Sequence, residues 1–453
     1  MPSSDDRASL FSLTLAANPS ARFVGDERGR VWLGDLGISS SVEGGADLRG
    51  RCVLVSATRQ LPAALAAIEL DGVARRLLLC PPDLADHLPY IVQAAGVDAV
   101  LTDKAEPALG VPVVRSDGVV RHPGWSADRK IDTEWVLFTS GTTGRPKMVV
   151  HTLSSLAGPL DDGSAVAAGT VWSTFYDIRR YGGLQILLRS LLGGGSMVLS
   201  SPDEATHDFL TRLGRSGVTH ISGTPSHWRK ALMSPAVTAV SPRYVRLSGE
   251  IADQAILDSL ARTFPGSDIA HAFASTEAGV AFDVRDGKAG FPASVIEGAD
   301  GKAEVRVVNG TLHVRSSRTS SGYINGRLSG SDGFVDTGDL VERRGDRYYF
   351  LGRREGVINV GGQKVFPEEV EDVIAQHPAI QMARVWARKN PITGAVVAAD
   401  VVLRAGTNAD FEYVRAELVQ HCRSRLPRWK LPATIRRVSS IELNASGKVA
   451  RRA

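Results

Sequence analysis

Short apolar runs alternate with helix-like spacing between residues 50 and 105. Residues 53–55 and 77–79 are wholly apolar and predict buried strands. Residues 62–68 and 88–95 instead repeat their apolar side chains at helical spacing. This alternation predicts α/β structure of the doubly wound kind, in which helices cover both faces of a sheet. The first 45 residues show little pattern, and we expect them to wrap the edge of the fold.

A second helix–strand unit follows residue 180. Four leucines between residues 184 and 191 are spaced i, i+3, i+4 and i+7, which places them on one helical face. Three consecutive glycines at 193–195 end that helix, and residues 197–199 predict the next strand. Farther along, residues 305–307 and 312–314 flank Asn309-Gly310, a strong hairpin signal. We therefore expect a β-rich patch after the doubly wound part.

The pattern changes again near Gly352 and Arg353, where we predict a domain boundary. Pro367 followed by Glu368 and Glu369 is favourable chemistry for the start of a helix. Residues 411–425 predict a second helix, which stops before a proline. The expected organisation is a large N-terminal domain, residues 1–352, and a small mobile C-terminal α/β domain, residues 353–453.

Composition and charge exclude several classes of protein. The 453 residues are too many for one ordinary core, and the net charge of +4 arises from scattered residues, which does not favour nucleic-acid binding. The three cysteines lack metal-ligand or disulfide spacing, which fits a reducing cytoplasm. We see neither a signal peptide nor a membrane span, and we expect a cytoplasmic monomer or homodimer.

Residues 139–147 carry the most specific chemistry in the chain. They follow the apolar run 135–138, which suits a buried strand. Glycines let backbone N–H groups approach anionic oxygens, hydroxyls add donors, and the basic side chains add charge. The residues that we expect to contact phosphate are Thr139, Ser140, Gly141, Thr142, Thr143, Gly144 and Lys147.

The P-loop of kinases and ATPases does not explain this segment. That loop ends in Gly-Lys-Ser/Thr because the hydroxyl binds magnesium. Here Pro146 precedes Lys147 and Met148 follows it. Taken alone, the segment also fits a surface loop without a ligand.

The segment resembles the phosphate loop of the adenylate-forming superfamily, which includes acyl-CoA synthetases, adenylation domains of peptide synthetases, and luciferases. Further matches follow in the family's order and cover roughly residues 40 to 453, and six short motifs in order make chance implausible. They are residues 247–250 (adenine), 273–277, 322–323 with 336–339 (ribose), 352–355 with 358–362 and 366–371 (hinge and start of the small domain), and 443–448 (catalytic lysine).

The resemblance implies an ATP-dependent carboxylate–CoA ligase that works in two steps through an acyl-adenylate and releases AMP and pyrophosphate. It implies ATP and Mg²⁺, a small carboxylic acid from fatty acid or aryl acid metabolism, and coenzyme A or a carrier-protein phosphopantetheine. Catalysis of phosphoryl transfer needs positioning and positive charge more than covalent help.

The resemblance also implies roles for individual residues. Lys448 bridges the carboxylate and the α-phosphate, Thr276 contacts the α-phosphate, and Glu277 holds magnesium. Asp339 binds the ribose hydroxyls. Arg353 helps to hold the ribose or the phosphate, or instead forms a structural ion pair. The remaining members of the expected nucleotide site are Ser248, Gly249, Glu250, Phe273, Ala274 and Ser275.

Three positions depart from the family's pattern. Phe273 replaces the usual tyrosine and can still stack on adenine, whereas Ala274 replaces a glycine. Glu355 stands at the hinge, where the family has aspartate or lysine. A hinge is needed because the lysine must leave before a thiol can approach.

The acyl pocket is the least determined part. Tyr176, Tyr181 and Trp228 are candidates for its wall, although a side chain of this kind more often belongs to a plain core. Arg179 and Arg180 suggest a polar group on the substrate, such as a second carboxylate; alternatively, both point to solvent or pair with Asp177. Because the chain has fewer residues before the phosphate loop than most relatives, pocket shape cannot be carried over.

Two alternatives to a CoA ligase stay open. One is a stand-alone adenylation enzyme that loads an acyl, aryl or amino acid onto a carrier protein, in which Asp177 grips an amino group. The other is a non-catalytic nucleotide sensor, which has no need of Lys448. The helix after Asp177 is more typical of the CoA ligases.

Overall fold

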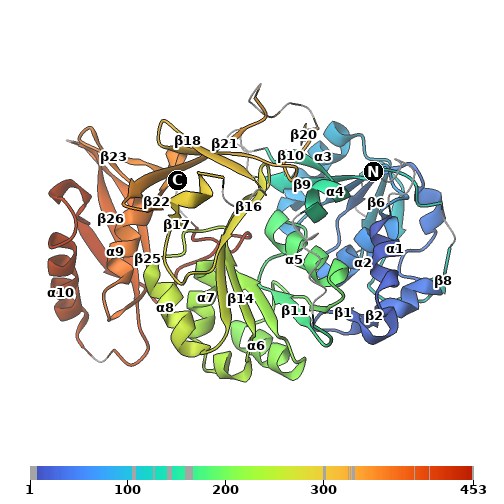
Figure 1. Cartoon of the computed structure of the whole chain (residues 1–453), viewed down its shortest axis with the longest axis horizontal. Helices are drawn as coiled ribbons and strands as arrows, with labels where there is room; N and C mark the ends of the chain where they lie inside the picture. The colour runs from blue at the N-terminus through green and yellow to red at the C-terminus, as the bar shows by residue number, and fades with distance from the viewer. Residues whose placement is uncertain are drawn as a thin grey trace.

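The described residues form three large β-sheets and a two-stranded one, followed by a smaller α/β unit (Figure 1). The computed structural model describes residues 8–104, 109–125, 128–139, 145–158, 167–298, 303–324, 326, 328, 332–391, 393–407 and 409–450. The blue sheet lies at one end of the long axis and the orange-to-red unit at the other.

The first sheet has seven strands in the order β20-β10-β9-β5-β4-β6-β7. Its centre is parallel, and β10 and β20 continue it in antiparallel fashion. The strands are β4 (Cys52–Val55), β5 (Arg76–Leu79), β6 (Ala99–Thr102), β7 (Val113–Arg115), β9 (Glu134–Thr139), β10 (Lys147–Thr152) and β20 (Gly322–Tyr323). Both predicted helices form, α2 (Gln60–Leu70) and α3 (Leu88–Ala95), and α2 is buried along its whole length.

The second sheet has eight strands in the order β16-β15-β14-β13-β11-β12-β1-β2. They are β1 (Phe23–Gly25), β2 (Arg30–Trp32), β11 (Val171–Thr174), β12 (Ser196–Val198), β13 (His220–Gly223), β14 (Tyr244–Ser248), β15 (Asp268–Ser275) and β16 (Gly279–Val284). Its helices are α5 (Tyr181–Leu192), α6 (Thr206–Arg215), α7 (Pro225–Leu232) and α8 (Gln254–Thr263).

Side chains of β14 in the eight-stranded sheet are apolar on one face and polar on the other at its carboxyl end. Ile221, Val245 and Leu247 pack in a cluster with residues of α6, α7 and α8. Because side chains alternate across a strand, Arg246 and Ser248 face the opposite way. The leucines of α5 pack with those of α2 in a separate core that lies between the two large sheets. A polar strand face near a buried helix is the first structural sign of a ligand site.

The third sheet has five strands in the order β17-β22-β21-β19-β18. They are β17 (Phe291–Pro292), β18 (Glu304–Val308), β19 (Thr311–Arg315), β21 (Val335–Arg344) and β22 (Arg347–Arg353). Asn309 and Gly310 both have positive φ, as the predicted two-residue hairpin turn requires. The expected β-rich patch is thus confirmed.

The last hundred residues build a separate hydrophobic core, whose members run from Ile358 to Ile435. The elements are β23 (Ile358–Val360), β24 (Gln363–Val365), α9 (Pro367–Ala375), β25 (Ile380–Asn390), β26 (Gly394–Leu403), α10 (Phe411–Arg423) and β27 (Thr434–Arg437). This separate core supports a boundary near residue 352, which stays a prediction.

The remaining elements are short. They are the helices α1 (Leu10–Ala16) and α4 (Leu153–Ala157), the strands β3 (Ser39–Ser40) and β8 (His122–Pro123), and the 3-10 turns Pro19–Ala21, Leu33–Gly37, Gly45–Leu48, Pro82–His87, Pro235–Ala239, Ala293–Val295, Arg354–Gly356 and Arg428–Lys430. The N-terminal strands β1 and β2 form one edge of the eight-stranded sheet, as expected for the unpatterned start of the chain. Within the described residues, no helix is both long and apolar enough to cross a membrane.

Candidate active site

The C-terminal tail brings Lys448 to the end of β14. A methyl group added at Gly249 would lie 3.4 Å from Cε of Lys448, so the lysine stem passes directly over this glycine. Gly249 has φ +83°, a conformation that other residues rarely adopt. Two predicted motifs that are 199 residues apart therefore meet at one place.

Two hydrogen bonds hold the tail on either side of Lys448. The Thr224 hydroxyl donates to the Gly447 carbonyl at 2.6 Å, and the Val449 N–H donates to Oε1 of Glu250 at 2.9 Å. The other oxygen of Glu250 accepts from the Ser226 N–H at 3.0 Å. Glu250 thus joins the start of α7 to the tail, and both flanks of the lysine are fixed.

Gly447 packs against the ring of His227 with no space for a side chain. An added methyl would lie 1.8 Å from Cε1 of the ring, far inside van der Waals contact. Burial lowers the pKa of His227 to about 3, so the ring is neutral at pH 7. Sequence reasoning missed His227 and Thr224, because neither belongs to a motif and both act only through tertiary contact.

The charges around Lys448 come from the predicted ribose-binding strands. Burial and then the Arg353 guanidinium lower the pKa of Lys448, while Glu250 and Asp339 oppose that shift. As a whole residue, Lys448 is nevertheless exposed to solvent. Arg353 pairs with Asp339, Nε to Oδ1 at 3.2 Å, because β21 and β22 place these residues opposite each other. The site thus places Lys448 and Arg353 beside the carboxylates of Glu250 and Asp339.

Glu277 lies at the other side of the site, just after β15. Its Oε1 is 3.4 Å from the Thr139 hydroxyl and 3.5 Å from the Tyr323 hydroxyl, which are long, weak contacts. Lone pairs of this carboxylate stay available, so Glu277 fits a Mg²⁺ ion whose other ligands are phosphate oxygens and water. Among the described residues, no three or more His, Cys, Asp or Glu side chains are grouped so that they could hold a metal ion by themselves.

His151 positions the segment that carries Thr276 and Glu277. Its Nε2 lies 2.7 Å from the Thr276 carbonyl oxygen, and its Nδ1 lies 3.0 Å from the Ser155 hydroxyl. Burial lowers the pKa of His151 to about 4, so the neutral ring donates its Nε2–H to that carbonyl. Sequence reasoning also missed this residue, since a lone histidine on a buried strand carries no signal.

The phosphate segment is described only at its ends. Ser140, Gly141, Thr142, Thr143 and Gly144 lie outside the described residues. Lys147 begins β10, and its Nζ lies 5.8 Å from the centre of the Tyr323 ring. Thr139 ends β9 and, through Glu277, is linked to the site.

Aromatic side chains divide between the site and the core. The Tyr176 hydroxyl donates to the Ser248 carbonyl at 2.7 Å, which brings this residue beside Gly249. Phe273 stacks on Phe282 and Phe350, and its stacking on adenine stays a prediction. Trp228 is completely buried on the apolar face of the sheet, where its contacts give no support for a role in the pocket.

The two arginines expected near the pocket already have partners. Arg179 is completely buried and pairs with Asp177 at 2.6 Å. Arg180 contacts both carboxylate oxygens of Asp83 at 2.6 Å, although it is near enough to Lys448 to lower its pKa. Tyr181 follows on α5 and is buried. The pairing of Arg179 with Asp177 matches the alternative left open by the sequence.

Ala274 and Ser275 end β15, and Glu355 lies in the turn that follows β22. Gly352 has φ +136°, and an added methyl there would lie 2.3 Å from Oε2 of Glu368 on α9. The chain therefore enters the small unit through a tightly packed glycine. The hinge role of Glu355 stays a prediction.

Asp372 of α9 lies near charged residues of the large domain, so the contact between the small and the large domain is sensitive to charge. Burial and then the Asp253 carboxylate of α8 raise the pKa of Asp372 to about 6, while Gln376, Arg229 and Arg344 oppose the shift. The Arg229 carbonyl also accepts a hydrogen bond from Gln381 of the small unit at 3.2 Å. The junction between the two parts is thus polar.

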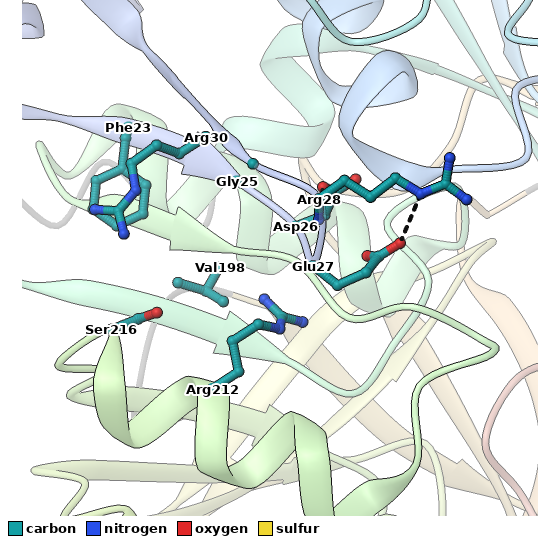
Figure 2. A pocket seen from close by; sticks show the side chains of 10 residues that line it. Phe23, Gly25, Asp26, Glu27, Arg28, Arg30, Val198, Arg212 and Ser216 are labelled. Carbon is teal, nitrogen blue, oxygen red and sulfur yellow. Dashed lines mark hydrogen bonds and ion pairs between the residues drawn. The ribbon is translucent and has the colours of Figure 1, made fainter.

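A surface hollow between β1, β2 and α6 does not share these features (Figure 2). Its charges are satisfied locally: Arg28 pairs with Glu27, and Arg212 pairs with Glu204. It lies at the β2 edge of the eight-stranded sheet, opposite the edge formed by β15 and β16. We therefore assign the site to the Lys448 region.

Comparisons with known proteins agree with this geometry. The family model for AMP-binding enzymes matches residues 62–324, and the model for their C-terminal domain matches residues 369–448. A 2-succinylbenzoate–CoA ligase of Bacillus velezensis is 29% identical over 342 residues, 71% of this chain and 68% of that protein. The enzyme of the same name from Bacillus cytotoxicus is 26% identical over 88% of this chain and 86% of that protein.

The fold is also shared with solved structures. The anthranilate CoA ligase AuaEII in complex with anthranoyl-AMP superimposes with a TM-score of 0.79 over 99% of this chain and 97% of that chain, at 17% identity. At this identity the likeness concerns the fold. The mixed α/β architecture with a large and a small domain is thus confirmed.

Proposed function

The chain belongs to the AMP-binding enzyme family, and from this premise we propose that it is an AMP-forming carboxylate–CoA ligase. In the first step a substrate carboxylate oxygen attacks the α-phosphorus of ATP, and the bond to pyrophosphate breaks. In the second step the thiolate of coenzyme A attacks the acyl carbonyl, and AMP leaves. The first step creates a good leaving group on an otherwise unreactive carboxylate.

The observation that carries the proposal is the fixed approach of Lys448. The hydrogen bonds at Gly447 and Val449 hold its backbone, and its stem crosses Gly249 beside Asp339 and Arg353. A cation held in this way stabilises the charge that develops on phosphoryl oxygens at little cost in reorganisation. This geometry supports the adenylating arrangement of the two domains.

Other residues take their roles from the chemistry of their side chains. Asp339 accepts hydrogen bonds from the ribose hydroxyls, with Arg353 holding its carboxylate in place. Thr276 contacts the α-phosphate, and its carbonyl is held by His151. Mg²⁺, bound by Glu277, would neutralise phosphate charge.

The second step requires Lys448 to withdraw. Rotation of the small domain about Glu355 would break the bonds of the tail to Thr224 and Glu250 and the hydrogen bond between Gln381 and the Arg229 carbonyl. Vacating the space over Gly249 opens a path for the thiol. The names of the relatives support an aryl-type acid as substrate and coenzyme A as the thiol.

Hydroxamate trapping with a panel of aliphatic and aryl acids, including 2-succinylbenzoate and anthranilate, tests the proposal with and without coenzyme A. We expect adenylate without coenzyme A and thioester with it. Thioester formation on a phosphopantetheine carrier protein but not on coenzyme A would instead establish the carrier-loading alternative. An absence of adenylate with every acid would refute an adenylating enzyme.

Replacement of the lysine separates the two steps. Lys448→Ala should lower pyrophosphate exchange by about 100- to 10,000-fold but spare thioester formation from supplied acyl-adenylate, because two charge-assisted contacts of about 1.5–3 kcal/mol each are lost in the first step alone. Lys364→Ala, which removes an exposed lysine of the same domain, is the matched control. Equal loss of both steps in Lys448→Ala would contradict its assigned role.

A further inference from the structure

Three arginines gather between α5 and the polar face of the eight-stranded sheet. Arg189 of α5, Arg246 of β14 and Arg318 act on one another electrostatically, and Arg246 and Arg318 are only 4% and 7% exposed. One carboxylate, Asp283 of β16, pairs with Arg246 at 2.7 Å. Burial lowers the pKa of the neighbouring His220 to about 4, so its ring is neutral at pH 7. This histidine therefore adds no positive charge to the three arginines.

Arg189 has the least satisfied charge of the three. Among the residues that the structure describes, its guanidinium has no hydrogen-bond or ion-pair partner. Arg318 donates to the Val280 carbonyl at 3.1 Å, and Arg246 has Asp283. Burial and then Arg246 lower the pKa of Arg189. Holding an unpaired cation beside like charges is costly unless an anion compensates it.

The arginine cluster is continuous with the candidate active site. Arg246 precedes Ser248 by two residues on β14, so both side chains share one face and lie roughly 7 Å apart along the strand. Ser248 is the residue that contacts Tyr176 beside Gly249 and Lys448. The cluster thus lies one step deeper than the reacting end of the site.

The neighbouring strands place small and polar side chains beside the cluster. Ala270 and Ala272 of β15, which are paired with Arg246 and Ser248, both carry small side chains. Ser222, opposite Arg246 on β13, is completely buried, and its hydroxyl has no partner among the described residues. A buried hydroxyl of this kind is normally satisfied, which points to a ligand. Oδ1 of Asp283 also lacks a partner there, but this oxygen only accepts hydrogen bonds and is therefore no partner for a carboxylate.

We propose that Arg189, backed by Arg246 and Arg318, binds a second carboxylate of the acid substrate. This inference rests on the proposed function and names its substrate class. The enzyme activates diacids whose two carboxylates are separated by roughly 7 Å, the distance of two strand residues. One carboxylate reaches Lys448, and the other meets the arginines.

Matched substrates test the proposal in the full-length protein. Pyrophosphate exchange is measured with adipate and terephthalate, and with the monoamide of each, which keeps shape but removes the second charge. We expect wild type to prefer each diacid over its monoamide by about 10- to 100-fold in kcat/KM, the value of a charge-assisted contact. Arg189→Met should bring this ratio close to one by lowering kcat/KM for the diacid, and Arg189→Lys should retain part of it. Arg215→Met removes an exposed arginine of α6 and should leave the ratio as in wild type.

The outcomes separate the two proposals. Exchange with the monoamides but not the diacids, or an Arg189→Met ratio equal to wild type, overturns the diacid inference and leaves the ligase standing. Loss of exchange with diacid and monoamide alike in Arg189→Met indicates a structural role and also overturns it. Wild-type protein that exchanges with no acid of either kind, including the wider panel above, refutes the proposed function itself.

Discussion

Replacing Gly447 by alanine should prevent the tail from docking. The added methyl would lie 1.8 Å from Cε1 and 2.3 Å from Nε2 of His227. That ring cannot turn aside freely, because it stacks on Phe175 at 5.4 Å and accepts a hydrogen bond from the Thr224 N–H. Carbon atoms attract one another at about 3.5–4.0 Å, so the tail must move by more than an ångström.

Gly447→Ala has two effects, a backbone strain and a clash with His227, and only the clash depends on the docked tail. Gly447 has φ +74°, and alanine in that conformation costs about 1–2 kcal/mol whether or not the tail is docked. The clash with His227 exists only in the docked arrangement and displaces Lys448. Since a misplacement of about 1 Å can cost about 100-fold in rate, adenylation should fall by at least about 100-fold. Thioester formation from supplied acyl-adenylate should not change.

The assay compares pyrophosphate exchange with the second half-reaction in matched variants. Gly394→Ala is the control, because Gly394 has φ +75° and no atom within 4 Å of the added methyl, so it carries the strain without the clash. His227→Ala combined with Gly447→Ala should recover part of the exchange, since the ring is gone, and the coupling between the two changes measures the contact. Exchange by Gly447→Ala at the rate of Gly394→Ala would refute the docked arrangement.

Two further predictions concern charge. Because burial and Asp253 raise the pKa of Asp372 to about 6 when the domains are in contact, docking should strengthen as pH falls through 6 and weaken as pH rises. Asp372→Asn should remove this pH dependence from pyrophosphate exchange and favour docking at pH 7 by about 1 kcal/mol after solvent screening. An unchanged pH profile in this variant would contradict the prediction. Arg179→Met leaves the Asp177 carboxylate buried without its partner and should lower the free energy of unfolding by about 3–5 kcal/mol in a denaturant titration, whereas raised KM for the acid with unchanged stability would restore a pocket role for Arg179.

The sequence predicted elements whose signals are local. The Asn309-Gly310 turn formed because both residues adopt positive φ more readily than others, and this preference does not depend on the rest of the chain. The leucines of α5 were placed correctly because helical spacing alone decides which side chains share a face. Lys448 was found through its motif. Its docking contacts were not, since Thr224 and Gly447 are brought together only by the folded domains.

The acyl pocket shows where such reasoning ends. Arg179, Arg180 and Arg189 lie within eleven residues of one another, and nothing local distinguishes them. The fold decides: Arg179 turns to Asp177, Arg180 turns to Asp83, and Arg189 lies among the arginines of β14 and of the segment after β19. A cation becomes available to substrate only when the tertiary structure withholds a partner from it. Under the diacid proposal, specificity for the acid substrate therefore depends on which charges the fold leaves unpaired. The three clustered arginines come from three separate segments of the chain, so no single sequence motif can contain this information.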